Sequence, residues 1–181
     1  MSVRVFVTSL CVGFAISAGA ASAWAAAAPG AATAPPPTSP CYNDAKSATP
    51  TSRYVLNGDE AQDKQTGLTW QRCSVGQSFK DGACTGDIKT FPWDKAMREA
   101  RGGWRVPTRD ELETLVTKTC LAPALNAEVF PSMDVTKLSY WTSSAPDSGL
   151  AWLVYFDGGS DFNGLRTSDN PVRLVKGGKG K

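Results

Sequence analysis

The chain contains no histidine among its 181 residues. This absence excludes a Ser-His-Asp or Cys-His nucleophile, a histidine-ligated zinc site and a histidine proton shuttle. The sequence also has no Cys-x-x-Cys pair, so a zinc site of the usual spacing is not expected. The formal net charge is only +2 at pH 7, which favours neither nucleic acid nor a membrane surface as a partner.

Long apolar runs are scarce, and the first one has the form of an export signal. Arg4 precedes an apolar stretch over residues 5–18, which is too short to cross a bilayer comfortably. Ala21-Ser22-Ala23 and Ala23-Trp24-Ala25 then both fit the small-x-small pattern of a cleavage site. We therefore predict a signal peptide over residues 1–25, with export to the periplasm or cell exterior and no membrane insertion after cleavage. An uncleaved membrane anchor is the alternative.

Composition divides the remaining chain into three segments. Residues 26–50 are rich in alanine and proline and predict a linker. Residues 51–177 have the size of one ordinary domain. Residues 178–181 form a short basic tail.

Four cysteines remain once Cys11 leaves with the signal peptide, namely Cys41, Cys73, Cys84 and Cys120. An even number in an exported chain predicts two disulfides, which can pair in three ways. Cys73 and Cys84 flank a glycine-rich polar loop, so we favour a Cys73–Cys84 bridge, with Cys41–Cys120 as the second.

Two helices are expected in the middle of the domain. The first spans residues 93–101, directly after Pro92, and places apolar residues on one side. The second spans residues 108–119, where Thr108 and Glu111 form a capping box after the strand stop at Pro107. In the irregular stretch that follows, Val129 and Phe130 are expected in the core, and Asn126 is expected to cap a turn.

Alternating and apolar segments predict the strands. A first hairpin pairs residues 53–56 with residues 68–73 through a long polar tip, and residues 151–156, apolar on both faces, lie centrally in a sheet. Further strands are predicted over 139–143, 161–166 and 171–176, with a turn at 157–160. The plan is α+β, with two helices packed on a twisted antiparallel sheet.

An ordered set of short motifs resembles one bacterial family, the Lcl C-terminal domain family, which is named for a collagen-like adhesin and largely classed as of unknown function. The motifs are Thr66–Gln71, Trp93–Ala96, Gly103–Thr108, Pro123–Asn126, Val129–Pro131, Tyr140–Ser144, Ala151–Phe156 and Val172–Gly178. The resemblance covers roughly residues 53–178.

The resemblance implies a C-type-lectin-like fold, akin to the formylglycine-generating enzyme group, in which the two ends of the domain meet on neighbouring strands. The adhesin binds sulfated glycosaminoglycans and related host surfaces. This chain has no collagen-like repeat and its domain is not strongly basic. The calcium-binding loop motifs of sugar-binding lectins are also missing.

Two groups of residues are weighed as ligand contacts. Trp104 beside Arg105 is consistent with a stacking platform, but we favour a core tryptophan and a structural ion pair. Trp70, Trp93, Trp141 and Trp152 are likewise expected in the core. The preferred candidates are polar residues near the end of the chain, where such folds commonly bind ligands, although a solvated turn would show the same composition. They are Asp157, Asp161, Asn163, Arg166, Asp169 and Asn170.

These observations predict an exported module that binds a glycan or a surface protein and does no chemistry. No cofactor or metal is expected, although carboxylates and amides of this kind also suit calcium. An enzyme-derived domain with formylglycine-generating-like oxidase activity is one alternative, for which the cysteines would have to be reactive. A structural protein of the cell envelope is another.

Overall fold

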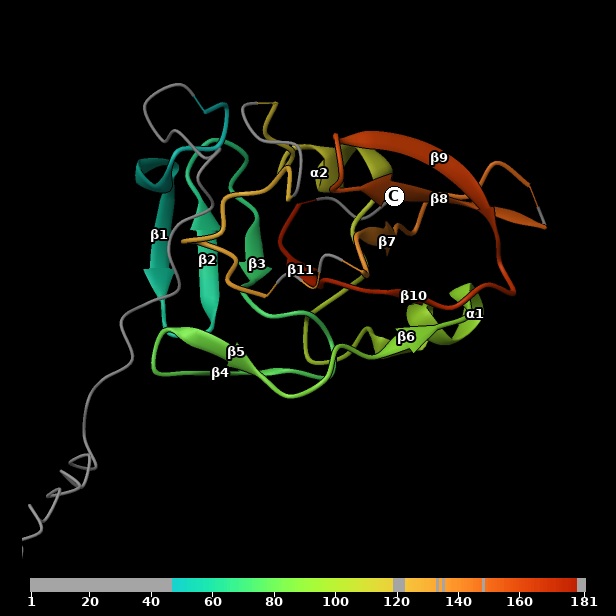
Figure 1. Ribbon diagram of the computed structural model, residues 1–181, viewed down its shortest axis with the longest axis horizontal. Coiled ribbons are helices and arrows are strands. Elements are labelled where there is room, and N and C mark those ends of the chain that lie inside the picture. The colour runs from blue at the N-terminus through green and yellow to red at the C-terminus, as the bar shows by residue number, and fades with distance from the viewer. Residues whose placement is uncertain (1–46, 119–122, 133, 135, 148, 179–181) are drawn as a thin grey trace, which may run out of the picture. The chain divides into compact units, whose positions relative to one another are not determined.

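Short strands dominate the part of the chain that the structure describes. The computed structural model describes residues 47–118, 123–132, 134, 136–147 and 149–178 (Figure 1). Two short helices, α1 (Trp93–Ala96) and α2 (Arg109–Glu113), accompany the strands. The predicted α+β class is thus confirmed, with more sheet than helix. The strands are β1 (Tyr54–Asn57), β2 (Glu60–Asp63), β3 (Thr69–Gln71), β4 (Ser78–Lys80), β5 (Ala83–Thr85), β6 (Thr90–Phe91), β7 (Ser139–Trp141), β8 (Leu150–Tyr155), β9 (Ser160–Leu165), β10 (Asn170–Pro171) and β11 (Val175–Lys176).

The first sheet has the strand order β1-β2-β3-β11 and is antiparallel throughout. The predicted hairpin between 53–56 and 68–73 is therefore wrong, because β2 lies between the two. β2 is polar in sequence, yet Ala61 and Asp63 alternate toward the interior and are fully buried. Asp63 is tolerated there because Arg53 pairs with its carboxylate at 2.5 Å.

The end of the domain does not return beside its beginning. β11 pairs with β3, so two strands separate it from β1, and the expected neighbouring strands are not observed. The predicted closing strand is also divided: β10 pairs with β6, and the buried residues Val172, Arg173 and Leu174 connect it to β11. The break lets one segment join two sheets.

Both helices are shorter than predicted. After α1, residues Met97–Glu99 form a 3-10 turn rather than further α-helix. The capping box between Thr108 and Glu111 is confirmed, but α2 ends after Glu113. The N–H groups of Leu115 and Val116 bond to carbonyls three residues back, which is the tighter 3-10 pattern. β-branched residues after Glu113 disfavour continued helix.

β8 is the central strand of the second sheet, β7-β8-β9, as predicted. Side chains of successive strand residues point to opposite faces, and two buried clusters follow from this alternation. One includes Val154, Tyr140 and Leu112 of α2; the other includes Leu153 and Trp141. The turn at 157–160 is confirmed, with Gly158 and Gly159 at positive φ. A Cβ on Gly159 would lie 2.3 Å from Val116.

The Cys73–Cys84 bridge is confirmed, with its Cα atoms 5.6 Å apart. Its partner bridge, Cys41–Cys120, lies outside the described residues, as do the predicted signal peptide, most of the linker and residues 179–181. The segment between Cys73 and Cys84 is not an irregular loop, because β4 and β5 pair within it. Their turn is Asp81-Gly82, both at positive φ, a favoured two-residue hairpin turn.

The predicted core is correct in part. Val129 and Phe130 are fully buried, and the Asn126 side chain accepts hydrogen bonds from the N–H groups of residues 128 and 129, which caps a turn. Trp70 and Trp141 are also fully buried. The other three tryptophans predicted for the core are only partly buried: Trp93 and Trp104 pack against the second buried cluster, whereas Trp152 belongs to neither cluster. No helix among the described residues is long and apolar enough to cross a membrane.

Candidate functional site

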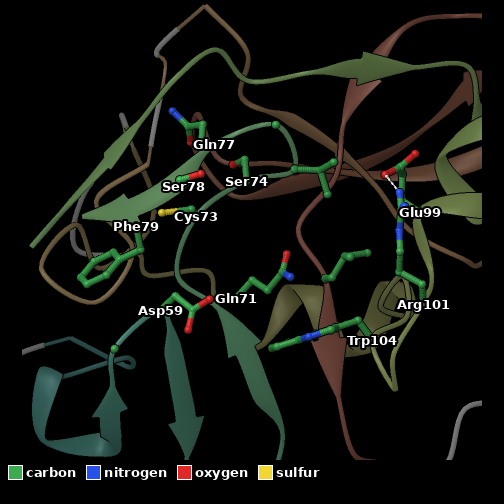
Figure 2. Close-up of a pocket in the computed structure, with 14 residues that line it drawn as sticks. Asp59, Gln71, Cys73, Ser74, Gln77, Ser78, Phe79, Glu99, Arg101 and Trp104 are labelled. Atoms are coloured by element: carbon green, nitrogen blue, oxygen red, sulfur yellow. Dashed lines mark hydrogen bonds and ion pairs between the residues drawn. The ribbon is translucent and has the colours of Figure 1, made fainter.

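One well-formed pocket among the described residues lies where the first sheet meets the β4–β5 hairpin. Its volume is about 550 Å³, within the range of about 300–1,000 Å³ typical of small-molecule sites. We call it the Trp104 pocket (Figure 2). It is lined by Gly58, Asp59, Gln71, Cys73, Ser74, Val75, Gly76, Gln77, Ser78, Phe79, Glu99, Arg101, Trp104 and Leu174.

Trp104 enters this pocket because of the backbone on either side of it. Gly102 and Gly103 both adopt positive φ, a conformation that glycine tolerates without strain. The next residue, Arg105, exchanges backbone hydrogen bonds with Val175 of β11 at 2.9 Å. The Nζ of Lys176 lies 4.1 Å from the centre of the Trp104 ring. The backbone beside the indole is therefore fixed to β11, and Lys176 contacts the ring, which also forms part of the pocket wall.

Arg105 takes the structural role that the sequence favoured. Its guanidinium donates to both carboxylate oxygens of Glu111, at 2.7 and 2.6 Å, and to the carbonyl of Gly177 at 2.7 Å. Burial alone would raise the pKa of Glu111, but the hydrogen bonds from Arg105 and from the Thr108 N–H outweigh it and lower that pKa. The cation beside the Trp104 ring is therefore Lys176, not Arg105.

Two polar side chains in the pocket have unused hydrogen-bonding capacity. Neither the Gln71 amide nor the Asp59 carboxylate has a partner among the described residues, and both line the pocket beside Trp104 (Figure 2). Glu99 and Arg101 stand across from the hairpin and pair with each other at 2.7 Å. An amide and a carboxylate beside an indole suit a ligand with hydroxyl groups and an apolar surface.

The opposite wall is held by the disulfide and a buried hydroxyl network. Ser74 Oγ lies 2.7 Å from the Tyr140 hydroxyl, and Ser132 Oγ donates to Ser74 Oγ. Gln77 accepts from Ser132 and donates to the carbonyl of Gly86. These contacts tie the start of the hairpin to the core, so the wall is pre-formed.

Arg72 supports the pocket from beneath. Its guanidinium donates to the carbonyls of Val129 at 2.8 Å and Gly58 at 3.1 Å, and it stacks 4.2 Å from the centre of the Phe79 ring. Burial lowers the pKa of Arg72. Because Gly58 and Phe79 both line the pocket, this one side chain positions two parts of its wall.

The six candidate ligand-binding residues near the end of the chain do not gather at a single site. Asp161 and Asn163 lie on the same face of β9, above Trp152 and Arg109. The Arg109 guanidinium stacks 4.6 Å from the Trp152 ring and lies 3.6 Å from Asp161. Burial, followed by the charge of Asp161, raises the pKa of Glu113 beside them. This face contributes nothing to the Trp104 pocket.

Three further candidates lie around Tyr155. Its hydroxyl donates to Asp157 at 3.1 Å, which raises the pKa of the tyrosine. Tyr155 also lines a pocket of about 200 Å³ together with Asp169 and Asn170. The side chains of Asp169 and Asn170 have no partner among the described residues. This second pocket keeps two of the predicted residues as binding candidates.

Arg166 has structural contacts that the sequence did not indicate. Its guanidinium donates to the carbonyls of Leu150 at 3.1 Å and Asp147 at 2.7 Å. It also stacks 4.1 Å from the centre of the Trp93 ring. The side chain therefore joins β9 to the loop before β8 and to α1.

We expect Arg166→Ala to lower the stability of the protein. Loss of two hydrogen bonds and one stacking contact should reduce the free energy of unfolding by about 1–3 kcal/mol. Urea unfolding of both proteins measures this change, with the exposed Arg98→Ala as the control. A variant that retained full stability would contradict the structural role.

The pocket residues beside Trp104 were not anticipated. Gln71 had the pattern of an exposed strand position, and Asp59 that of a turn. Glu99 and Arg101 lay in a segment expected to be helical. Only Trp104 was weighed as a platform. No local signal links these positions, because the residues that form the pocket extend from Gly58 to Leu174 in the sequence.

No three cysteine, aspartate or glutamate side chains gather into a possible metal site within the described part of the chain.

The family of the domain follows from comparison with known proteins. No curated protein matches the chain. The model of the Lcl C-terminal domain family matches residues 59–176, which include every strand except β1, both α-helices and nearly the whole Trp104 pocket. Since this match extends over well more than half of the sequence, the chain belongs to the Lcl C-terminal domain family.

Proposed function

We propose that this protein is an exported, non-catalytic module that binds a glycan in the Trp104 pocket. We further propose that its domain is a variant of the C-type-lectin-like fold and that Cys41–Cys120 forms a second disulfide. The periplasm and the cell exterior both suit these bridges. The proposal moves the principal site from the late loops to a pocket of suitable volume.

One observation carries this proposal: Trp104 shares the pocket with hydrogen-bonding groups that nothing else occupies. A sugar ring has an apolar face that can pack on an indole, and hydroxyl groups that both donate and accept. The Gln71 amide can do the same, and the Asp59 carboxylate accepts. The rigid hairpin wall supports binding further, because a pre-formed site spends little free energy on ordering.

Two alternatives have less support. An oxidase akin to the formylglycine-generating group needs reactive thiols, whereas Cys73 and Cys84 are joined in a disulfide. A purely structural envelope protein would not need free polar groups around an indole. A surface protein remains the competing ligand, since Phe162 and Leu165 on β9 are exposed.

The test is a glycan array of neutral and sulfated oligosaccharides, with and without calcium, followed by calorimetry on the strongest hit. Trp104→Ala should weaken binding by at least about 30-fold, because a tryptophan at the centre of an interface commonly contributes 2 kcal/mol or more. Gln71→Ala should weaken it by up to about tenfold through one lost hydrogen bond.

Gln62→Ala is the matched control, because Gln62 is an exposed glutamine of neighbouring β2 outside the pocket. It should leave both affinity and stability unchanged. Glycan binding that persists in Gln71→Ala and Trp104→Ala would place the site elsewhere. Binding lost in Arg166→Ala at unchanged stability would return it to the late loops.

A further inference from the structure

The Trp104 pocket is the first of three pockets that share their walls. A second, which we call the middle pocket, has a volume of about 240 Å³ and also uses Gln77 as a lining residue. The disulfide separates the two, with Cys73 lining the Trp104 pocket and Cys84 lining the middle one. The two pockets are therefore adjacent, separated by Gln77 and the Cys73–Cys84 disulfide.

Lys137 connects the middle pocket to the small pocket of Asp169 and Asn170, which we call the Asn170 pocket. Its side chain lines both, and its Nζ lies 3.8 Å from Asp134 and 3.5 Å from the carbonyl of Ile88. The three pockets therefore form a row. Gln77 lines both the Trp104 pocket and the middle pocket, and Lys137 lines both the middle pocket and the Asn170 pocket.

The volumes argue against three independent sites. The middle and Asn170 pockets, at about 240 and 200 Å³, fall below the usual range of about 300–1,000 Å³ for a small-molecule site. Each is a reasonable size for one part of a longer ligand. Free side chains occur at both ends of the row, namely Gln71 and Asp59 at one end and Asn170 at the other, so a long ligand would find hydrogen-bonding partners at both ends.

The charge of the row selects among polymers. Carboxylates outnumber cations along the three walls, and Arg101 already pairs with Glu99 while Lys137 lies beside Asp134. A polyanion would meet repulsion here. The carboxylates are Asp59, Asp87, Glu99, Asp134 and Asp169, and the cations are Arg101 and Lys137.

We propose that the three pockets are consecutive subsites for one linear, uncharged oligosaccharide, and that sulfated chains are disfavoured. The inference rests on the proposed glycan function and adds the length and charge of the ligand. The Asn170 pocket then has a role as the distal subsite, which gives two of the late-loop residues a part in binding.

Calorimetry with N-acetylglucosamine oligomers of two to six units tests this directly, with a heparin hexasaccharide as the anionic comparison. Affinity should rise about tenfold or more between the dimer and the hexamer, as added units reach new hydrogen-bonding groups. The heparin hexasaccharide should bind at least about tenfold more weakly than the uncharged hexamer.

Asn170→Ala should remove most of the gain with length while leaving the dimer affinity unchanged. Asn163→Ala is the matched control, because Asn163 is an exposed asparagine that lines none of the three pockets. It should bind every oligomer as the unaltered protein does. Gln71→Ala should weaken dimer and hexamer alike.

The outcomes separate this inference from the function beneath it. Equal affinity for all lengths, with Gln71→Ala still harmful, would overturn the row of subsites and leave a single glycan pocket. Tighter binding of the heparin hexasaccharide would overturn the charge selection. Failure of every oligomer and of heparin to bind would overturn the glycan function itself.

Discussion

Asp63→Ala is expected to reduce the free energy of unfolding by about 3–5 kcal/mol, the range for breaking a buried ion pair. The carboxylate of Asp63, the last residue of β2, is fully buried and accepts hydrogen bonds from Arg53 at 2.5 and 2.7 Å. Thr66 and the backbone N–H of Gln65 donate to it as well. Removing the carboxylate takes the acceptor from two nitrogens of the Arg53 guanidinium, from Thr66 and from the Gln65 N–H.

The comparison with Asp59→Ala isolates this effect. Asp59 lies in the adjoining turn and is exposed, and its carboxylate has no partner among the described residues, so removing the carboxylate should change stability by less than about 0.5 kcal/mol. Urea unfolding followed by tryptophan fluorescence measures both variants. Equal stability of the two would contradict the role assigned to the Arg53–Asp63 pair.

Acid should weaken the protein through the same carboxylate and through Glu111. Burial alone raises the pKa of Asp63, but the hydrogen bonds from Arg53, Thr66 and Gln65 outweigh it and lower that pKa, as Arg105 and Thr108 do for Glu111. A carboxyl group with a lowered pKa in the folded state stabilises it fully above its unfolded pKa, about 4. This stabilisation is lost as the pH falls from there through the folded-state pKa.

The midpoint of thermal unfolding should therefore be nearly constant from pH 7 to about pH 5 and fall steeply below about pH 4. In Asp63→Asn the fall should be shallower, because one of the carboxyl groups with a lowered pKa is missing. A variant that lost stability with acid as steeply as the original protein would show that Asp63 is not one of the groups responsible.

Arg173→Ala is expected to have an effect of similar size, about 3–5 kcal/mol. Arg173 is fully buried between β10 and β11, and its guanidinium donates to the carbonyls of Gln71 at 2.8 Å and Arg72 at 2.6 Å. It also lies 5.0 Å from the centre of the Phe130 ring. Truncation to alanine would open a cavity and leave these carbonyls without donors.

Burial lowers the pKa of Arg173, and its Nε has no hydrogen-bond partner among the described residues. Arg173→Met keeps much of the packing volume and removes the buried charge, so its loss of stability should be smaller than that of Arg173→Ala. Arg98→Ala, which removes an exposed arginine, is the control and should be neutral. Equal losses in the methionine and alanine variants would mean that the hydrogen bonds dominate over packing.

The Arg173 variants also connect stability to the proposed site. Gln71 lines the Trp104 pocket, and Arg173 binds its backbone carbonyl. A folded Arg173→Met protein should therefore bind glycan more weakly than the original, although Arg173 itself does not line the pocket.

Sequence patterns anticipated the features whose causes are local. The Thr108–Glu111 capping box needs only residues three positions apart, and the turn at 157–160 needs only its glycines. The Cys73–Cys84 bridge followed from the composition of the loop between them. The predicted helix lengths were wrong, because the continuation of a helix beyond its first turn depends on tertiary packing.

The errors arose where distant contacts override local preference. The polar segment Glu60–Asp63 was expected as a hairpin tip, since nothing nearby shows that Arg53 neutralises a buried carboxylate there. Arg166 had the composition of a ligand contact, yet Trp93 and two carbonyls engage it. Such pairings connect residues 10 to 73 positions apart, so they produce no periodic pattern in the sequence.

By itself, the sequence determined the family, the α+β class, the capped helix, the central strand and one disulfide, because each rests on short-range rules or on motifs in order. Only the tertiary structure decided the candidate site. The Trp104 pocket joins a turn, a strand end, a hairpin and a 3-10 segment, and its free amide and carboxylate become meaningful only when packing brings them beside the indole. Burial and pairing are properties of the folded chain, and they separate a ligand contact from a structural one.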